Sequence, residues 1–130
     1  MNIHWKSFFA GLCSLWLVGC GPAAKDDTIR IAVIPKGTTH EFWQSIHAGA
    51  RKAEKELTAQ GKSVEIIWKG PLKEDDRDQQ MGLVESFTVK GVDGIVLAPL
   101  DAKALVRPVE SAQKSGIPVV IIDSGLGTTN

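Results

Sequence analysis

Four apolar runs, separated by segments with helical spacing, constrain the fold of this chain more than any other feature. The runs are rich in β-branched residues, begin about 25 to 35 positions apart, and occupy residues 29–35, 64–68, 92–97 and 117–122. Strands that alternate with helices at this interval form βαβ units with parallel strands. The sequence therefore predicts an α/β fold with a parallel sheet of about four strands and flanking helices. The almost unbroken apolar character of the last two runs predicts strands covered on both faces.

The segments between the runs predict three helices. The first has one apolar stripe, whose members are three and four positions apart: Trp43, Ile46, Ala50, Ala53 and Leu57. Thr38 and Glu41 have the spacing of a capping box at its start. The second is expected over 76–90, with Met81, Val84 and Phe87 on its buried face. In the third segment we expect a short turn over 102–106 and then a helix with Pro108 in its first turn.

The loops that follow the four runs are the candidate ligand-binding region, because ligands of open parallel sheets bind outside the carboxyl ends of the strands. Their residues are 36–43, 69–75, 98–101 and 123–127. The first loop is rich in aromatic and polar side chains, and the last begins with a carboxylate. Aromatic faces suit the C–H faces of a sugar, and a carboxylate accepts strong hydrogen bonds from hydroxyl groups.

Five residues of these loops are candidate ligand-binding residues, and each has an alternative role. Trp43 begins the apolar stripe and is equally suited to the core, whereas Phe42 is one step off the stripe and is the better candidate to face a ligand. His40 is otherwise an ordinary residue of the first helical turn, and Lys36 a solvated cation. Asp123 directly follows the fourth run, where it either contacts a ligand or caps the next turn.

Motifs for enzymatic chemistry, cofactors and nucleic acid are missing from the sequence. No Gly-x-Gly-x-x-Gly follows the first run, and neither Gly-x-x-x-x-Gly-Lys nor Gly-x-Ser-x-Gly occurs. The histidines His4, His40 and His47 do not have the spacing of a metal cluster. Fifteen basic residues balance fifteen acidic ones, which argues against a nucleic-acid partner. We therefore expect a binding protein without catalysis, cofactor or metal.

The N-terminus has the pattern of an export signal. Lys6 precedes an uncharged apolar stretch over 7–18, about 12 residues long, whereas a membrane-spanning helix needs about 20. Residues 17–20 (LVGC) resemble the lipobox of bacterial lipoproteins, which implies cleavage before Cys20 and attachment of lipid to its thiol. We expect a signal peptide over 1–19 and a tether over 20–28. The alternative is an uncleaved N-terminal anchor with an incidental cysteine.

Five short segments together resemble the ribose-binding-protein-like family of periplasmic solute-binding proteins, the substrate receptors of ABC importers. They are 31–35 (IAVIP), 41–43 (EFW), 48–50 (AGA), 91–99 (GVDGIVLAP) and 116–123 (GIPVVIID). The resemblance covers about residues 29–126. It implies an exported, membrane-anchored lipoprotein that faces the periplasm or the cell exterior, with a sugar or similar polyol as ligand and a membrane permease as partner.

Members of this family bind the sugar between two α/β lobes. The resemblance implies that Phe42 and Trp43 stack on the sugar and that Lys36, His40 and Asp123 make polar contacts. Two positions depart from the ribose binders, because Ala98 replaces an amide and Ser124 an arginine, so we expect another sugar or a polyol.

The family needs roughly twice this many mature residues. We therefore expect 29–130 to form part of the N-terminal lobe, with half of the cleft, in a fragment or a truncated gene product. Alternatives are a periplasmic sugar sensor, a non-functional truncated product, a sugar-responsive transcription regulator and a flavodoxin-like enzyme.

Overall fold

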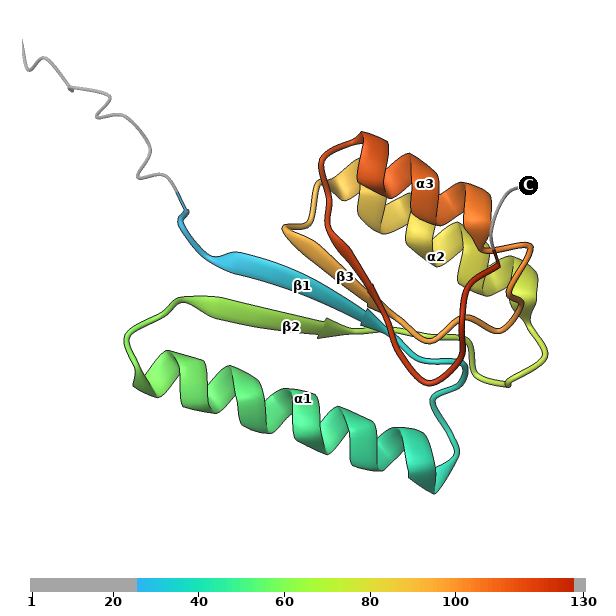
Figure 1. Ribbon diagram of the computed structural model, residues 1–130. Helices are drawn as coiled ribbons and strands as arrows, with labels where there is room; N and C mark the ends of the chain where they lie inside the picture. The colour runs from blue at the N-terminus through green and yellow to red at the C-terminus, as the bar shows by residue number, and fades with distance from the viewer. Residues whose placement is uncertain (1–25, 128–130) are drawn as a thin grey trace, which may run out of the picture.

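The computed structural model describes residues 26–127, in which strands and helices alternate along the chain (Figure 1). The strands are β1 (Ile29–Ile34), β2 (Val64–Trp68), β3 (Gly94–Leu97) and β4 (Val119–Ile121). The helices are α1 (Glu41–Ala59), α2 (Arg77–Lys90) and α3 (Val106–Lys114). The predicted α/β fold is confirmed, and every predicted strand and helix lies within a few residues of its expected bounds. The predicted signal peptide and Cys20 lie outside the described residues.

The four strands form one parallel sheet in the order β2-β1-β3-β4. In its register, Ala32 of β1 lies opposite Ile67 of β2 and Ile95 of β3. The chain moves outward from β1 to β2, then crosses back to β3 on the other side of β1 and continues to β4. The direction of winding therefore reverses between β1 and β3. In open α/β sheets such a switch point opens a crevice at the carboxyl ends of the strands.

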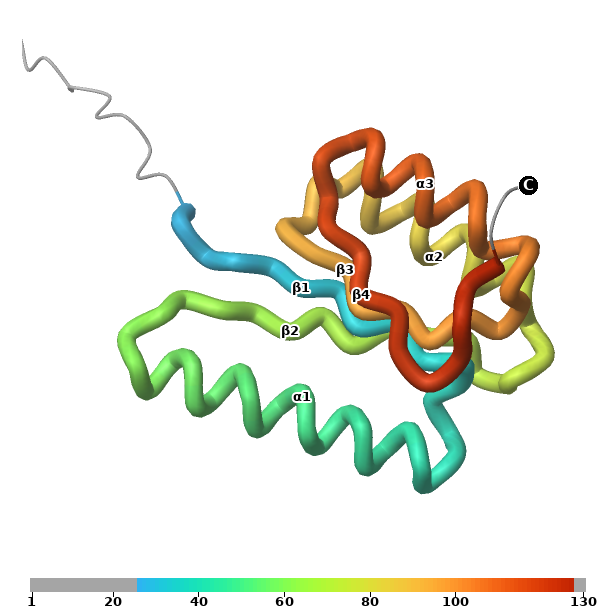
Figure 2. Tube along the Cα trace, viewed as in Figure 1, coloured from blue at the N-terminus to red at the C-terminus, as the bar shows by residue number. Residues whose placement is uncertain are grey.

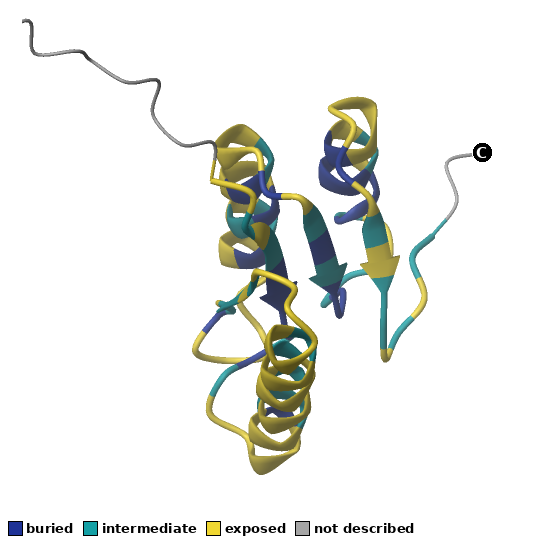
Figure 3. Cartoon of the chain, turned by 90° about the vertical axis from the view of Figure 1, so that its left-hand side faces the viewer, coloured by how far each residue is buried: buried dark blue, intermediate teal, exposed yellow. Residues whose placement is uncertain are grey.

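The helices cover the two faces of the sheet unequally. Helix α1 packs on one face, against β2, while α2 and α3 pack side by side on the other (Figures 1 and 3). The main core lies beneath α2 and α3 and consists of Ala32, Ile34, Val84, Phe87, Val92, Ile95, Leu97, Leu105, Val109, Ala112 and Ile117. Because side chains alternate between the faces of a strand, β1 and β3 each contribute every second residue to this core.

The prediction that the fourth strand is covered on both faces is wrong. Val120 is 57% exposed, and its neighbours Val119 and Ile121 are half-buried. The reason is positional: β4 is an edge strand, and α1 lies under β2 rather than under β4 (Figure 3). A continuous apolar run shows that a strand is suited to burial on both faces. It does not show whether the described part of the chain provides helices to cover both faces.

The start of α1 also differs from its prediction. Its N-cap is His40, and Thr38 does not form a capping box. The Thr38 hydroxyl instead donates to the Pro71 carbonyl in the loop after β2, at 3.2 Å.

Within the apolar stripe of α1, Ala53 is exposed, and Glu54 occupies the sheet-facing position instead. The Glu54 carboxylate accepts a hydrogen bond of 2.8 Å from the N–H of Ile66 in the edge strand β2. This contact protects part of an otherwise open strand edge.

A polar cap and a glycine set the ends of α2, and a capped turn precedes α3. Asp76 caps α2 by accepting from the Gln79 N–H, and Gly91 ends it in the left-handed conformation, with φ 66°. The Asp101 carboxylate accepts from two N–H groups of the turn over 102–105, which precedes α3. Pro108 lies in the first turn of α3, as predicted, where no hydrogen bond is lost.

Gln80 is a fully buried polar side chain on α2 that joins the ends of β1 and β3. Its amide nitrogen donates to the carbonyls of Pro35 (3.0 Å) and Ala98 (2.8 Å). Its amide oxygen accepts from the N–H of Leu100 at 2.8 Å. The buried amide is thereby paired at both ends, as a stable fold requires. These bonds fix the spacing of two loops at the switch point of the sheet.

Replacing Gln80 by leucine keeps most of the volume but leaves the Pro35 and Ala98 carbonyls without their partner. We expect Gln80→Leu to lower the free energy of unfolding by about 2–4 kcal/mol, because buried polar groups then lack hydrogen bonds. Urea denaturation followed by circular dichroism measures the change. Gln79→Leu on the exposed side of the same turn is the control and should shift the value by less than about 0.5 kcal/mol. Equal stability of both variants would contradict the role of Gln80.

Candidate functional site

A hollow of about 450 Å³ lies at the carboxyl ends of the strands. Its lining residues are Lys36, His40, Phe42, Trp43, Glu74 and Asp123. All five residues that the sequence nominates are therefore brought to one place, from the loop after β1, the first turn of α1 and the loop after β4. Glu74, in the loop after β2, was not among the candidates. The hollow lies at the end of the sheet where the switch-point rule places ligands.

The first turn of α1 presents the aromatic side chains. His40 has an extended backbone (φ −74°, ψ 140°), and its Nδ1 accepts a hydrogen bond of 3.2 Å from the Phe42 N–H. Its carbonyl accepts from the Trp43 N–H, so the chain enters the helix directly after it. With Nδ1 occupied by this bond, Nε2 is the ring nitrogen that His40 can offer to a ligand.

Phe42 and Trp43 form an edge-to-face pair with ring centroids 4.9 Å apart and an interplanar angle of 79°. Phe42 is 48% exposed, whereas Trp43 is 3% exposed. This difference agrees with their positions on and beside the apolar stripe of α1. Phe42 therefore offers an accessible ring to the hollow, and Trp43 supplies a buried wall behind it. The Trp43 indole Nε1–H donates to Glu74 Oε1 at 2.7 Å.

A charged pair closes the opposite side of the hollow. The Lys36 ammonium lies 2.7 Å from Asp123 Oδ2 and also donates to the Ser124 hydroxyl, which in turn contacts Asp123 at 3.1 Å. Asp123 has φ 63°, a conformation that non-glycine residues rarely adopt. The Ser124 N–H donates to the Ile122 carbonyl at 2.7 Å, which makes the turn around Asp123 tight. The strained turn and the ion pair together direct this carboxylate to the rim.

The Lys36 ammonium, which donates to the Asp123 carboxylate, lowers the pKa of that carboxyl below its ordinary value of 3.8. The Ser124 hydroxyl acts in the same direction, and partial burial opposes both. Asp123 is therefore ionised at neutral pH, and its oxygens are acceptors for hydroxyl groups.

Glu74 reaches the hollow because the loops after β1 and β2 are joined. The hydroxyls of Thr38 and Thr39 donate to the carbonyls of Pro71 and Leu72, each at 3.2 Å. A Cβ at Gly37 would lie 2.9 Å from Glu74 Cγ, so the glycine leaves room for the Glu74 side chain. Glu74 lies in the loop over 69–75 that the sequence nominated, but nothing in the sequence distinguishes it from the neighbouring acidic residues Asp75 and Asp76.

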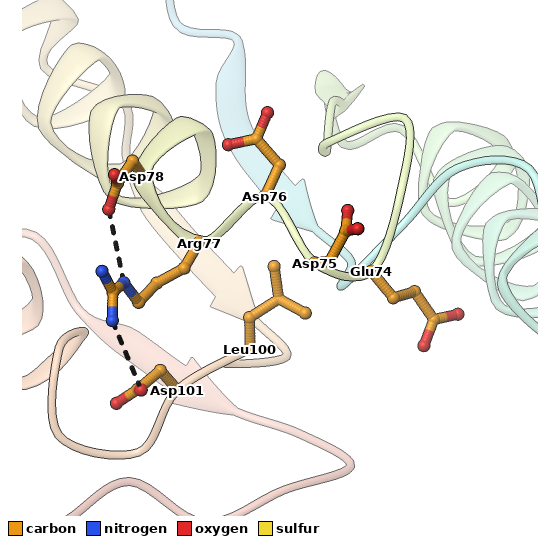
Figure 4. Close-up of a pocket in the computed structure, with 7 residues that line it drawn as sticks. All are labelled: Glu74, Asp75, Asp76, Arg77, Asp78, Leu100 and Asp101. Carbon is orange, nitrogen blue, oxygen red and sulfur yellow. Dashed lines mark hydrogen bonds and ion pairs between the residues drawn. The ribbon is translucent and has the colours of Figure 1, made fainter.

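A second, acidic hollow of about 310 Å³ lies beside the first, between the start of α2 and the loop after β3 (Figure 4). There Arg77 lies between two carboxylates, 3.3 Å from Asp78 and 3.9 Å from Asp101. Backbone N–H groups of the following turn lower the pKa of Asp101. Figure 4 shows the Glu74 carboxylate directed away from Arg77. The charges of Asp78 and Asp101 thus have a local partner, and Glu74 does not share it.

The segment after β4 is tied to the turn before α3. The chain turns back beyond β4 (Figure 2), and the Gly127 N–H donates to the Ala102 carbonyl at 2.7 Å. A Cβ at Gly127 would lie 2.9 Å from that oxygen, so only glycine permits this approach. The contact holds the loop after β4, and with it Asp123, near the rim.

Metal-binding clusters and membrane-spanning helices are both absent from residues 26–127. No group of three or more His, Cys, Asp and Glu side chains within this range is arranged to hold a metal ion. None of the helices in the described part of the chain has both the length and the apolar character needed to cross a membrane.

Residues 31–130 match the periplasmic binding protein domain family, and the chain belongs to this family. It is similar to the D-ribose/D-allose-binding protein of Pseudomonas aeruginosa, with 39% identity over 95 residues, which are 73% of this chain and 29% of that protein. It is also similar to the D-allose-binding periplasmic protein of Escherichia coli, with 34% identity over 130 residues, which are 100% of this chain and 39% of that protein.

Solved structures show the same fold. A periplasmic solute binding protein of an ABC transporter from Actinobacillus succinogenes, with bound D-allose, matches with a TM-score of 0.70 and 31% identity. The match covers 76% of this chain and 33% of that one. The resemblance to periplasmic sugar-binding proteins that the sequence suggested is confirmed. The chain spans about a third of the length of these relatives.

The pKa of Asp123 gives a test of the charged pair. We expect its carboxyl to titrate below pH 3.8 and Lys36→Met to raise the midpoint, because the variant loses the cation that stabilises the carboxylate. Since the folded pKa is lowered, the stabilising contribution is present above pH 3.8 and is lost as pH falls through the folded pKa. It amounts to less than about 1 kcal/mol, because both groups are partly exposed.

Carboxyl-carbon NMR of the wild type and of Lys36→Met measures both midpoints. Ser124→Ala should raise the midpoint less than Lys36→Met does. A midpoint that stays the same without Lys36 would show that the ion pair does not form in solution.

Proposed function

We propose that this chain is the N-terminal part of an exported receptor that binds a sugar or similar polyol for an ABC-type importer. The observation that carries the proposal is the meeting of Phe42, Trp43, Lys36 and Asp123 around one hollow at the switch point of the sheet. Both relatives described above are named for sugars that they bind, and the solved structure holds D-allose. The role is binding and presentation to a membrane permease, not catalysis.

The chemistry of the hollow suits a neutral, hydroxyl-rich ring. The exposed face of Phe42 packs against the C–H face of a sugar, with the buried Trp43 ring supporting it. The Asp123 oxygens accept hydroxyl hydrogen bonds, Lys36 donates them, and the His40 ring nitrogen Nε2 offers a further polar contact. Charged partners make these bonds stronger than neutral ones. The aromatic rings form the surface on which the ligand packs, and the polar groups fix its orientation. This division of roles is typical of small-molecule sites.

We propose that a second lobe completes the hollow, which is open in the described part of the chain. Phe42 remains 48% exposed, and the relatives are about three times as long as this chain. A lobe that closes over the rim would exclude water and contact the other side of the sugar. Small-molecule sites bury most of their ligand, so we expect tight binding to need both lobes.

We further propose that the protein is a lipoprotein. The support is the sequence around Cys20, where an uncharged stretch of about 12 residues over 7–18 ends in LVGC. Lipid on Cys20 and a tether over 20–28 would hold the folded part, which begins with β1 at Ile29, near the permease. A single acyl chain binds membranes only weakly, so a lipoprotein anchor needs more than one.

Phe42→Ala tests the sugar site. We expect the variant to bind D-allose and D-ribose at least about ten-fold more weakly, because the accessible ring that packs on the sugar is lost. Ligand-detected NMR at millimolar sugar measures the affinity. Val89→Ala is the control, since Val89 is 88% exposed on α2 and remote from the hollow, and it should bind like the wild type. Equal loss in both variants, or none in Phe42→Ala, would remove the hollow as the sugar site.

Cys20→Ser tests the anchor. We expect it to abolish incorporation of labelled fatty acid and to release the protein from the membrane fraction of an expressing bacterium, because the hydroxyl cannot replace the thiol that receives the lipid. Cys13→Ser is the matched control and should incorporate fatty acid normally, since Cys13 precedes the expected cleavage site. Membrane association of Cys20→Ser equal to that of wild type would contradict lipidation at this cysteine.

A further inference from the structure

We propose that Glu74 is a positioning and specificity-determining residue of the hollow, which holds the Trp43 indole and favours neutral polyols over anionic sugars. The selectivity rests on the sugar-binding function proposed above, whereas the positioning of Trp43 does not need it. Glu74 lies in the loop after β2, separate from the aromatic turn of α1 and from the charged pair at the end of β4.

The Trp43 indole is buried and needs a hydrogen-bond partner. Trp43 is 3% exposed, so its Nε1–H cannot rely on bulk water for a partner. It donates to Glu74 Oε1 at 2.7 Å, a short distance that is typical of a hydrogen bond to a charged acceptor. A buried donor that loses its partner is costly. Glu74 therefore fixes the orientation of the ring against which Phe42 makes its edge-to-face contact.

Glu74 is held in place by contacts between the loops around it. The loop after β2 is bound to the loop after β1 through the hydroxyls of Thr38 and Thr39. Gly37 admits the Glu74 side chain at a point where any Cβ would lie 2.9 Å from it. These contacts between the loop after β1 and the loop after β2 direct the Glu74 carboxylate to the hollow, although the residue itself is exposed.

The hollow is lined by charged groups of both signs. Lys36 is the one cation among the described residues that line it, and it is paired with Asp123 at 2.7 Å. His40 uses its Nδ1 to accept from the Phe42 N–H. The nearby Arg77 lies against Asp78 and Asp101, and Glu74 points away from it (Figure 4).

The lining of the hollow therefore has a net negative charge, located at Glu74, and more carboxylates line the hollow beside it. A carboxylate or phosphate on a ligand would meet a like charge, whereas a hydroxyl group would find an acceptor. The expected consequence is selection for neutral sugars.

The ligand-free test uses tryptophan side-chain N–H signals of the full chain, labelled with nitrogen-15. The Trp43 signal is assigned by its disappearance in Trp43→Phe. We expect Glu74→Leu to shift it strongly, because the acceptor is lost, and Glu74→Gln to leave it close to the wild-type position, because an amide oxygen still accepts. Glu56→Gln is the matched control: it removes the same charge from an exposed residue of α1, remote from the hollow, and should shift nothing. An unmoved Trp43 signal in Glu74→Leu would overturn the positioning role.

The selectivity test compares the affinities of the same proteins for D-allose and for D-glucuronate, the anionic probe. We expect wild type and Glu56→Gln to prefer D-allose and Glu74→Gln to lose at least five-fold of that preference, because only the charge is removed. Glu74→Leu should in addition bind D-allose more weakly, since Trp43 loses its hydrogen bond. An unchanged preference in Glu74→Gln would overturn the selectivity.

A wild type that binds neither D-allose nor D-ribose would instead overturn the proposed function, and the selectivity with it. The indole measurement would still decide the positioning role of Glu74.

Discussion

The three hydrogen bonds of the Gln80 amide hold together the part of the structure on which the candidate site depends. They join the Pro35 and Ala98 carbonyls and the Leu100 N–H, at the point where the winding of the sheet reverses. A parallel sheet opens at such a point, because neighbouring strands continue into helices on opposite faces. Without a buried group that pairs both loops, their polar backbone would need water inside the core. Gln80 meets this requirement and so places Lys36, the residue after Pro35, at the rim.

The hollow is built from loops that are far apart in the sequence, and each loop is held by a different contact. The aromatic turn is fixed by the His40 cap, the loop after β2 by threonine hydroxyls, and the turn of Asp123 by Lys36 and Ser124. The cation beside Asp123 comes from Lys36, which follows β1 and is far from Asp123 in the sequence. A contact between distant loops therefore sets the charge at this part of the rim.

The sequence predicted the strands, the helices and the rim, but not the contacts between loops. Apolar periodicity reports which residues are suited to burial, so the strand of Ala32 follows from it, whereas for Trp43 it left the core and the ligand site as equal alternatives. It does not report what covers a strand, and Val120 is exposed where burial was expected. Thr38 has a capping-box spacing, yet its hydroxyl bonds to a carbonyl 33 residues away. A sequence motif such as a capping box considers only hydrogen-bond partners that are near in the sequence. It does not predict a more favourable partner that is distant in the sequence and is brought close by the fold.

The sequence by itself determined that this chain folds as alternating strands and helices, belongs among the periplasmic binding proteins, and carries aromatic and acidic residues where strands end. These properties depend on residue type and on spacing along the chain. Only the tertiary structure decided that Glu74 holds the Trp43 indole, that Lys36 neutralises Asp123, and that Gln80 is buried. The physical reason is that a polar side chain is stabilised by whichever partner the fold brings within about 3 Å, and that partner is set by the packing of loops rather than by neighbours in the sequence.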